Sequence, residues 1–153
     1  RVAAMNIYLA SRYSRLEEMN GYAIDLRTRG HTVGARWLLG AHQAPDAWLV
    51  EAATDDMPLL ARRFALEDIE DIKQADLLIS FTEPPRSPNG SRGGRHVEFG
   101  IAYALGKLLV VVGPRENVFH TLPEVMRFPT WAEFLATLDD EPLCLRVRYS
   151  SEP

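Results

Sequence analysis

Glu98 is the residue of this sequence best suited to chemistry. It follows the glycine pair Gly93 and Gly94 and lies in a predicted helix that ends at Gly106, on a face of otherwise small and apolar side chains. In the first helical turn its carboxylate would be stabilised as an anion, and a sheltered anion can act as a covalent or electrostatic catalyst. The alternative is a glutamate that serves only the helix terminus.

Asp68 is a second carboxylate in an unusual position. A predicted helix over about residues 55–74 carries an apolar stripe, and Asp68 lies within that stripe between Phe64 and Ile72. Desolvation on such a face favours the protonated carboxyl, so we expect the pKa of Asp68 to be raised. The alternative is a structural ion pair or a cap for a neighbouring loop.

An ionised and a protonated carboxyl together suit the cleavage of a glycosidic bond. Glu98 would attack or stabilise the anomeric carbon, and Asp68 would protonate the leaving group, with the carboxyls about 5 Å apart in a retaining mechanism. Tyr8 lies in the middle of a predicted strand. We expect it to pack in the core or to hydrogen-bond Glu98 and orient it.

The elements that must position these residues alternate between strands and helices. This alternation predicts an open α/β sheet, covered by helices on both faces. Ser11 is expected to cap the first helix, 41–53 fits either a strand or a helix, and 113–129 is expected to be irregular. The other elements predicted are strands at Met5–Ala10, His31–Leu39, Asp76–Phe81, Leu108–Val112 and Leu143–Tyr149, and helices at Tyr13–Arg29 and about 130–138.

Ligands of open α/β sheets bind beyond the carboxyl ends of the strands. The loop over residues 82–95 follows one such end and lacks both the lysine of a Walker motif and the glycine spacing of a dinucleotide fingerprint. A solvated loop without a ligand is the alternative. The candidate substrate ligands at these ends, several of them suited to a phosphate, are Ser11, Arg12, Ser91, Arg92, Gly93 and Gly94.

Composition restricts the class of protein. The 153 residues fit one domain over 1–153, with residues 1–4 expected to be a leader or an expression remnant. A net charge of −4 gives no argument for a nucleic-acid polymer as partner, and no apolar run or signal peptide indicates a membrane, so we expect a cytoplasmic protein. Cys144 is the only cysteine and the four histidines lack metal-ligand spacing, so no metal and no cofactor are expected.

Three motifs together resemble the nucleoside 2-deoxyribosyltransferase family, which includes related nucleotide N-glycoside hydrolases. The resemblance extends over roughly Met5 to Leu138, and the glutamate-helix motif is its most specific part. The motifs are IYLAS over residues 7–11, DxxxIxxxDLL over residues 68–78 and GxxxExGxAxAxGK over residues 94–107.

The resemblance implies a fold, a mechanism and an assembly. The fold would be a flavodoxin-like, mainly parallel five-stranded sheet. Glu98 would be the nucleophile that forms a glycosyl-enzyme intermediate, Asp68 would hydrogen-bond and help protonate the base, and Tyr8 would position Glu98. The enzyme would act as a homodimer or larger homo-oligomer with shared active sites, to which Asn117 of a neighbouring subunit would contribute.

Three functions are compatible with these residues. The leading hypothesis is an enzyme that cleaves or transfers across the N-glycosidic bond of 2′-deoxynucleosides. The arginine-rich loop before Glu98 is longer than in compact transferases, which favours as second hypothesis a hydrolase of nucleoside 5′-monophosphates. A nucleotide-binding module without turnover is the hypothesis from another class.

Overall fold

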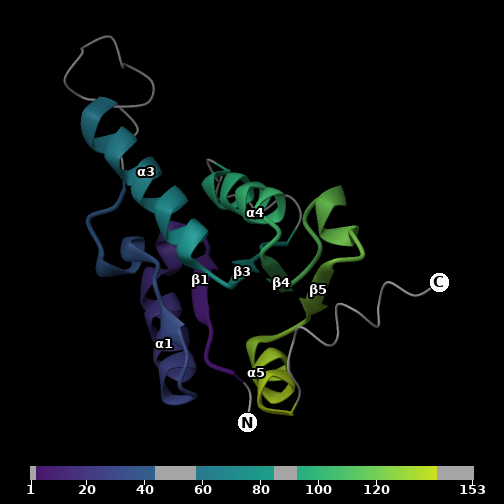
Figure 1. The fold of residues 1–153 in the computed structure, drawn as a ribbon. Coiled ribbons are helices and arrows are strands. Elements are labelled where there is room, and N and C mark those ends of the chain that lie inside the picture. Colours follow the sequence, from purple (N-terminus) through teal and green to yellow (C-terminus); the bar gives the residue numbers. More distant parts are fainter. Residues whose placement is uncertain (1–2, 44–57, 85–92, 141–153) are drawn as a thin grey trace.

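The computed structural model describes residues 3–43, 58–84 and 93–140. Its sheet has five strands, all parallel, in the order β2-β1-β3-β4-β5 (Figure 1). This order is that of flavodoxin-like sheets, whose switch point lies between β1 and β3. The predicted fold class is therefore confirmed. The strands are β1 at Asn6–Ala10, β2 at Thr32–Val33, β3 at Leu77–Phe81, β4 at Leu108–Val112 and β5 at Val125–Phe128.

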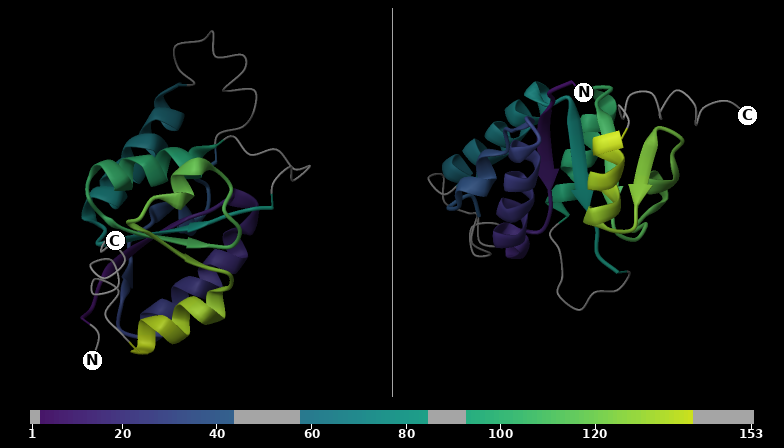
Figure 2. Two further views of the ribbon diagram at one scale, coloured as in Figure 1. Left: turned by 90° about the vertical axis from the view of Figure 1, so that its right-hand side faces the viewer. Right: turned by 90° about the horizontal axis from the view of Figure 1, so that it is seen from below.

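Helices cover both faces of the sheet. Helices α1 and α5 lie on one face, and α3 and α4 lie on the other (Figure 2). The helices are α1 at Leu16–Thr28, α3 at Pro58–Gln74, α4 at Gly94–Ala104 and α5 at Trp131–Asp140, with short 3-10 helices η1 at Tyr13–Arg15, η2 at Arg36–Leu39 and η3 at Val118–Thr121.

The three central strands form the core, and their side chains alternate between the two faces. All residues of β3 are buried, as are all but the first of β1 and of β4. Register pairs Tyr8 with Leu78 and Ala10 with Ser80, so these four side chains point to the same face. That face is the one covered by α3 and α4.

The opposite face is closed by an aromatic cluster. The ring of Tyr22 stacks on Phe81 at 5.3 Å and on Trp131 at 4.4 Å, and Trp131 lies 5.1 Å from Phe134. The indole N–H of Trp131 donates to Asp25 Oδ2 over 2.8 Å. The cluster joins α1 and α5 to β3 through ring contacts and one hydrogen bond.

The second strand is shorter than predicted. Only Thr32–Val33 pairs with β1, whereas the prediction extended to Leu39. The chain leaves the sheet because the main-chain N–H of Arg36 donates to Asp71 Oδ2 over 2.7 Å instead of to a neighbouring strand. The last four residues of the predicted strand, Arg36–Leu39, form η2.

The prediction that Ser11 caps the first helix is also wrong. The helical segment begins with η1, whose N-cap is Arg12, and α1 follows only at Leu16. The hydroxyl of Ser11 is buried and has no hydrogen-bond partner among the described residues. It is turned inward, away from the helix amides.

The fifth strand lies where an irregular segment was expected. Residues 113–129 contain η3 and β5, and β5 pairs with β4 in parallel register. Its pattern is weak because it has only four residues, of which one is buried. The edge strand predicted at Leu143–Tyr149, Cys144 and most of the open segment 41–53 lie outside the described residues.

A polar clamp joins η2 to α3. By helical periodicity Asp71 belongs on the face of α3 opposite the apolar stripe, yet it is only 8% exposed. Its carboxylate accepts from Arg36 Nε over 2.8 Å as well as from the Arg36 main chain, and Arg36 Nη2 donates to Glu67 O over 3.0 Å. Charge-assisted bonds of this kind are about twice as strong as neutral ones.

We expect Asp71→Ala to lower the free energy of unfolding by about 2 kcal/mol, because it removes two bonds to a charged acceptor and leaves the Arg36 amide without its partner. Urea denaturation measures the effect. Glu70→Ala, at the exposed neighbouring position, is the control and should change stability by no more than about 0.5 kcal/mol. Equal losses in the two variants would contradict the clamp.

Candidate active site

Three polar side chains meet on the α3/α4 face of the sheet, next to the switch point. Tyr8 comes from β1, Asp68 from α3 and Glu98 from α4. The structure thus brings together the three residues that the sequence singled out as catalytic candidates. Parallel strands flanked by packed helices hold them on rigid elements rather than on loops.

Tyr8 links the two carboxylates. Its side chain is 1% exposed, and its pKa is raised well above the ordinary value by burial, by the charges of Glu98 and Asp68 and by hydrogen bonding to both. Among the described residues the hydroxyl has no partner within strict hydrogen-bond geometry, although it is close enough to both carboxylates to act on them. The three groups therefore form one electrostatic unit.

Glu98 lies deeper in its helix than predicted. Gly93, with a φ of 79°, turns the chain into α4, which begins at Gly94, so Glu98 belongs to the second turn. The helix N-terminus acts only on the first turn. Burial and the charge of Asp68 instead raise the pKa of Glu98 to about 8, against opposing effects of Tyr8 and Arg95. The helix N-terminus therefore does not provide the stabilisation of the Glu98 anion that the sequence suggested.

Asp68 has the environment that the apolar stripe predicted. Burial is the largest cause of its raised pKa, and the charge of His42 is the largest effect that opposes it. His42 Nε2 lies 3.2 Å from Asp68 Oδ1. Asp68 thus also has a close side-chain neighbour of the kind considered as the alternative. The sequence did not indicate it, because His42 lies in the segment without a clear pattern.

Two interacting carboxyl groups titrate as a pair rather than independently. Because burial raises the pKa values of both carboxyls, and the charge of Asp68 raises that of Glu98 further, the pair retains one proton over part of the neutral range. One carboxylate and one carboxylic acid are what a displacement with a protonated leaving group requires.

Further unpaired polar atoms surround this unit. Among the described residues the hydroxyls of Ser11 and Ser80 are buried without a hydrogen-bond partner. Ser80 pairs in register with Ala10, at the carboxyl ends of β3 and β1, and was not singled out from the sequence. Buried polar groups without partners are rare, and here they offer hydrogen bonds to a polar ligand.

A second polar network holds the start of α4. Arg95 pairs with Glu116, the main-chain N–H of Glu116 donates to His120 Nδ1 over 3.1 Å, and Asn117 Nδ2 lies 3.4 Å from both His96 Nδ1 and His120 Nε2. The pKa of each histidine is lowered, chiefly by burial. Asn117 therefore lies beside α4 of its own chain, and Arg95 has an acidic partner in its own chain.

The arginines after β1 are held by an acid after β3. Arg12 Nη1 lies 3.9 Å and Arg15 Nη1 3.3 Å from the carboxylate of Glu83. The main-chain N–H of Glu83 in turn donates to Glu116 Oε2 over 3.2 Å, which connects this group to the network at α4. Ser91 and Arg92, the other candidate ligands, lie outside the described residues.

Two kinds of feature are absent from the described residues. Over residues 3–43, 58–84 and 93–140 no group of three or more His, Cys, Asp or Glu side chains is arranged to hold a metal ion. Within the same ranges no helix has the length and apolar character needed to cross a membrane.

Because the pKa of Glu98 rises from 4.5 to about 8, the folded protein holds this proton more tightly than the unfolded chain. The tighter binding of this proton contributes fully to the free energy of unfolding below about pH 4.5, and this contribution is lost as the pH rises through about 8. Glu98→Gln removes this loss, so we expect its melting temperature to exceed that of the wild type by about 5 °C or more at about pH 9, and by little at about pH 5.

Calorimetric scans at the two pH values measure this difference. The exposed Glu17→Gln variant is the control and should follow the wild type at both. A gap between Glu98→Gln and wild type that stays constant with pH would contradict the raised pKa.

Comparison with known proteins identifies the fold. No protein-family model and no curated protein matches the sequence. A solved 2-deoxyribosyltransferase of Bacillus psychrosaccharolyticus matches with a TM-score of 0.62 and 23% identity, over 86% of this chain and 91% of its own. A solved CMP N-glycosidase of Clostridium botulinum matches with a TM-score of 0.53 and 22% identity, over 88% of this chain and 98% of its own. The chain therefore has the fold of the family that the glutamate-helix motif predicted.

Proposed function

We propose that this protein is an enzyme that breaks the N-glycosidic bond of a 2′-deoxynucleoside or of its 5′-monophosphate, with Glu98 as nucleophile. The observation that carries the proposal is the electrostatic contact of Tyr8, Asp68 and Glu98 at the sheet's switch point. A non-catalytic module has no use for two carboxyl groups whose burial raises both pKa values.

The first step forms a glycosyl-enzyme ester. The Glu98 carboxylate attacks C1′ of the sugar while the bond from C1′ to the base nitrogen breaks, and the base leaves with the proton of Asp68. The shared proton must lie on Asp68 for this step. Tyr8 lies between the two carboxyls and lowers the pKa of each, so its hydroxyl would have to turn to the Glu98 carboxylate to favour this arrangement.

The second step releases the sugar. Water, or the nitrogen of a second base, attacks C1′ and displaces the Glu98 carboxylate, while the Asp68 carboxylate takes the proton that the acceptor loses. Water as acceptor makes the protein a hydrolase, and a second base makes it a transferase. Both routes return Glu98 ionised and Asp68 protonated, ready for another cycle.

The substrate class follows from the surroundings of this unit and from the structural neighbours. One neighbour is a 2-deoxyribosyltransferase and the other an N-glycosidase of CMP, a nucleoside monophosphate. Arg12 and Arg15 after β1 provide the positive charge that a 5′-phosphate would need, in competition with Glu83. Unpaired hydroxyls at Ser11 and Ser80 suit the sugar.

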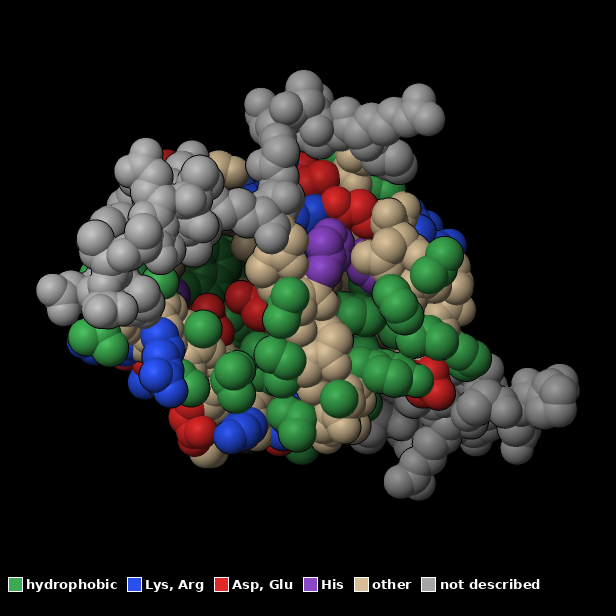
Figure 3. Space-filling model, turned by 90° about the horizontal axis from the view of Figure 1, so that it is seen from above, with side chains coloured by type: hydrophobic (Ala, Val, Ile, Leu, Met, Phe, Trp, Pro, Cys, Tyr) green, Lys and Arg blue, Asp and Glu red, His purple; other side chains and the backbone are tan. Residues whose placement is uncertain are grey.

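We also propose a homo-oligomer with shared sites. Exposed apolar side chains gather along α4 and on η3, where the view from above shows a broad hydrophobic area (Figure 3). An exposed apolar area of this kind suits contact with a second copy. Asn117 directly precedes η3, so it borders this surface and is suited to complete a neighbouring site. The residues are Val97, Tyr103, Leu105, Val118 and Phe119, from 43% to 74% exposed.

The activity is tested by incubating the protein with a panel of deoxynucleosides and their 5′-monophosphates, with and without a second free base. Chromatography should detect free base. We expect Glu98→Gln to lower kcat by about 10³-fold or more, because the amide cannot form the glycosyl ester, while substrate binding persists. Glu17→Gln, exposed on α1, is the control and should retain full activity.

The products decide between the hypotheses. Base release from monophosphates without exchange identifies the hydrolase, and exchange from unphosphorylated nucleosides identifies the transferase. Undiminished base release by Glu98→Gln would refute the nucleophile. Calorimetric binding of nucleotides without any product would support a binding module instead.

The oligomer is tested by Val118→Glu, which puts a charge into the apolar surface. We expect self-association to weaken about tenfold or more, as measured by gel filtration with light scattering over a range of concentrations. Leu39→Glu is the matched control, since Leu39 is 87% exposed and lies on η2, beyond the opposite edge of the sheet. A wild-type monomer, or equal effects of the two variants, would contradict the proposed interface.

A further inference from the structure

The chain takes a strained turn just before His42. Gly40 and Ala41 have φ values of 84° and 55°, and Ala41 is the only residue other than glycine with a positive φ in the described part of the chain. An L-residue rarely adopts this conformation, and strain of this kind is retained where the surrounding structure requires it. The turn directs the chain from η2 back onto α3, which it meets with the side chain of His42.

His42 is packed against α3 on every side that the structure describes. Its side chain is 7% exposed, and its ring lies 4.3 Å from the ring of Phe64. Nε2 lies 3.2 Å from Phe64 O and 3.2 Å from Asp68 Oδ1, and Nδ1 lies 3.6 Å from Glu67 Oε2. The two ring nitrogens thus have three oxygen atoms as neighbours, an arrangement that a surface histidine without a role does not need.

The neighbours of Nε2 show that this ring nitrogen carries a hydrogen. A main-chain carbonyl and a carboxylate oxygen can only accept, so Nε2 carries a hydrogen. Nε2–H donates to Phe64 O in this structure, while the buried Asp68 Oδ1 receives no hydrogen bond of good geometry. The same N–H can therefore turn from the carbonyl to the carboxylate, since both oxygens lie at equal distance from Nε2.

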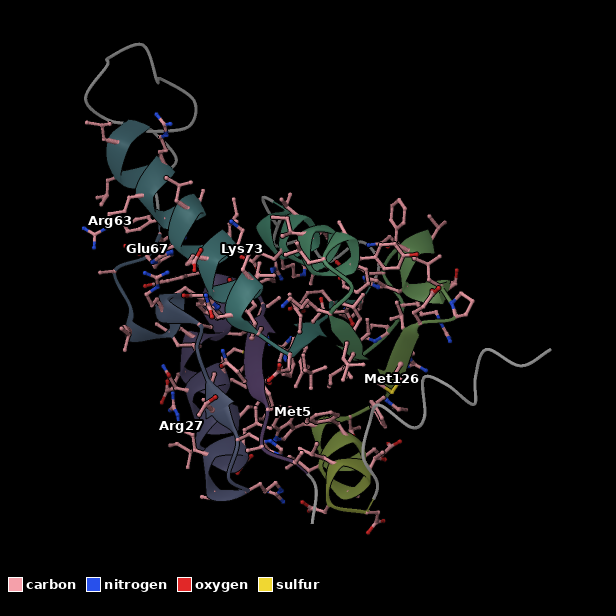
Figure 4. All side chains as sticks on the ribbon, in the orientation of Figure 1. Met5, Arg27, Arg63, Glu67, Lys73 and Met126 are labelled. Atoms are coloured by element: carbon pink, nitrogen blue, oxygen red, sulfur yellow. The ribbon has the colours of Figure 1, made fainter. Side chains whose placement is uncertain are left out.

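The charges around this contact come from several elements. On α3, Glu67 is held by Arg63 over 2.6 Å, and these two side chains lie next to one another along the helix (Figure 4). Arg36 of η2 also acts on Glu67, and its charge helps to lower the pKa of that carboxyl.

Asp68 faces a different set of groups. Tyr8 of β1 and Glu98 of α4 lie on its other side, and Asp71 follows one turn later on α3. Among the groups that act on Asp68, His42 and Tyr8 favour the ionised carboxylate, whereas burial and Asp71 disfavour it.

We propose that His42 is a positioning residue for Asp68: its Nε2–H moves from Phe64 O to Asp68 Oδ1 when Asp68 loses its proton. This inference rests on the proposed function in assigning that proton loss to departure of the base. The bond formed stabilises the carboxylate at the moment it appears. It also holds the side chain on α3 while the proton is returned in the second step.

His42 thereby offsets the effect of burial on the pKa of Asp68. A carboxylic acid kept protonated by burial is a weak acid, and a general acid works best with a pKa near the operating pH. A donor that stabilises the ionised form strengthens the acid by lowering its pKa. No atom is gained or lost in this movement; one hydrogen bond is exchanged for another.

The test compares His42→Phe, which keeps the ring on Phe64 but has no donor, with His42→Gln, whose amide N–H can reach the position of Nε2. Carboxyl ¹³C NMR follows the titration of Asp68, identified by the loss of its signal in Asp68→Asn. We expect His42→Phe to raise the pKa of Asp68 by about one unit, and His42→Gln to raise it by less.

Kinetics provide the second readout. If protonated Asp68 is required, kcat falls on the alkaline side as Asp68 ionises. In His42→Phe this alkaline fall of kcat should move to higher pH by the same amount as the pKa of Asp68. The plateau of kcat should fall about tenfold and be restored largely by His42→Gln, with little change in KM. A histidine needed only for packing would leave the pH profile unchanged.

The outcomes separate this inference from the proposed function. Identical Asp68 titrations in wild type and both folded variants would overturn the role of His42. So would equal losses of kcat in His42→Phe and His42→Gln with unmoved pH profiles. A raised Asp68 titration in a protein that releases no base from any substrate would support the contact and overturn the proposed function instead.

Discussion

The rest of this structure depends on the contact between two buried carboxyl groups, those of Glu98 and Asp68, beside the buried Tyr8. Burial raises the pKa of both Glu98 and Asp68, and the charge of Asp68 raises that of Glu98 further. Each group comes from a different helix, so their relation depends on how α3 and α4 lie over β1. The clamp between Arg36 and Asp71 holds α3 from one side.

Local patterns were sufficient to predict much of this arrangement. The strands around Tyr8, Leu78 and Val110 are short apolar runs, which mark central strands of a parallel sheet without reference to the rest of the chain. Helical periodicity placed Asp68 on an apolar face, and the glycine-rich start of the next helix marked Glu98. These are properties of single elements, and they predicted both the fold class and the three central side chains.

Properties that depend on two distant segments could not be predicted in this way. The raised pKa of Glu98 was not predicted because it depends on Asp68, which belongs to another helix. The contact of His42 with Asp68 requires a turn through Ala41 that no propensity favours. Likewise Asp71 is on the polar side of its helix by pattern, yet it is buried because Arg36 lies over it.

The aromatic cluster on the other face stabilises the molecule apart from the groups proposed to do chemistry. Tyr22, Phe81 and Trp131 bind α1 and α5 to the sheet with no reactive group among them, and the polar groups proposed to do chemistry all lie across the sheet or at its carboxyl edge. Selection can therefore act on the two layers separately. A lineage could adapt to temperature by repacking the aromatic layer, while the loops after β3 and β4 diversify toward new substrates over an unchanged foundation.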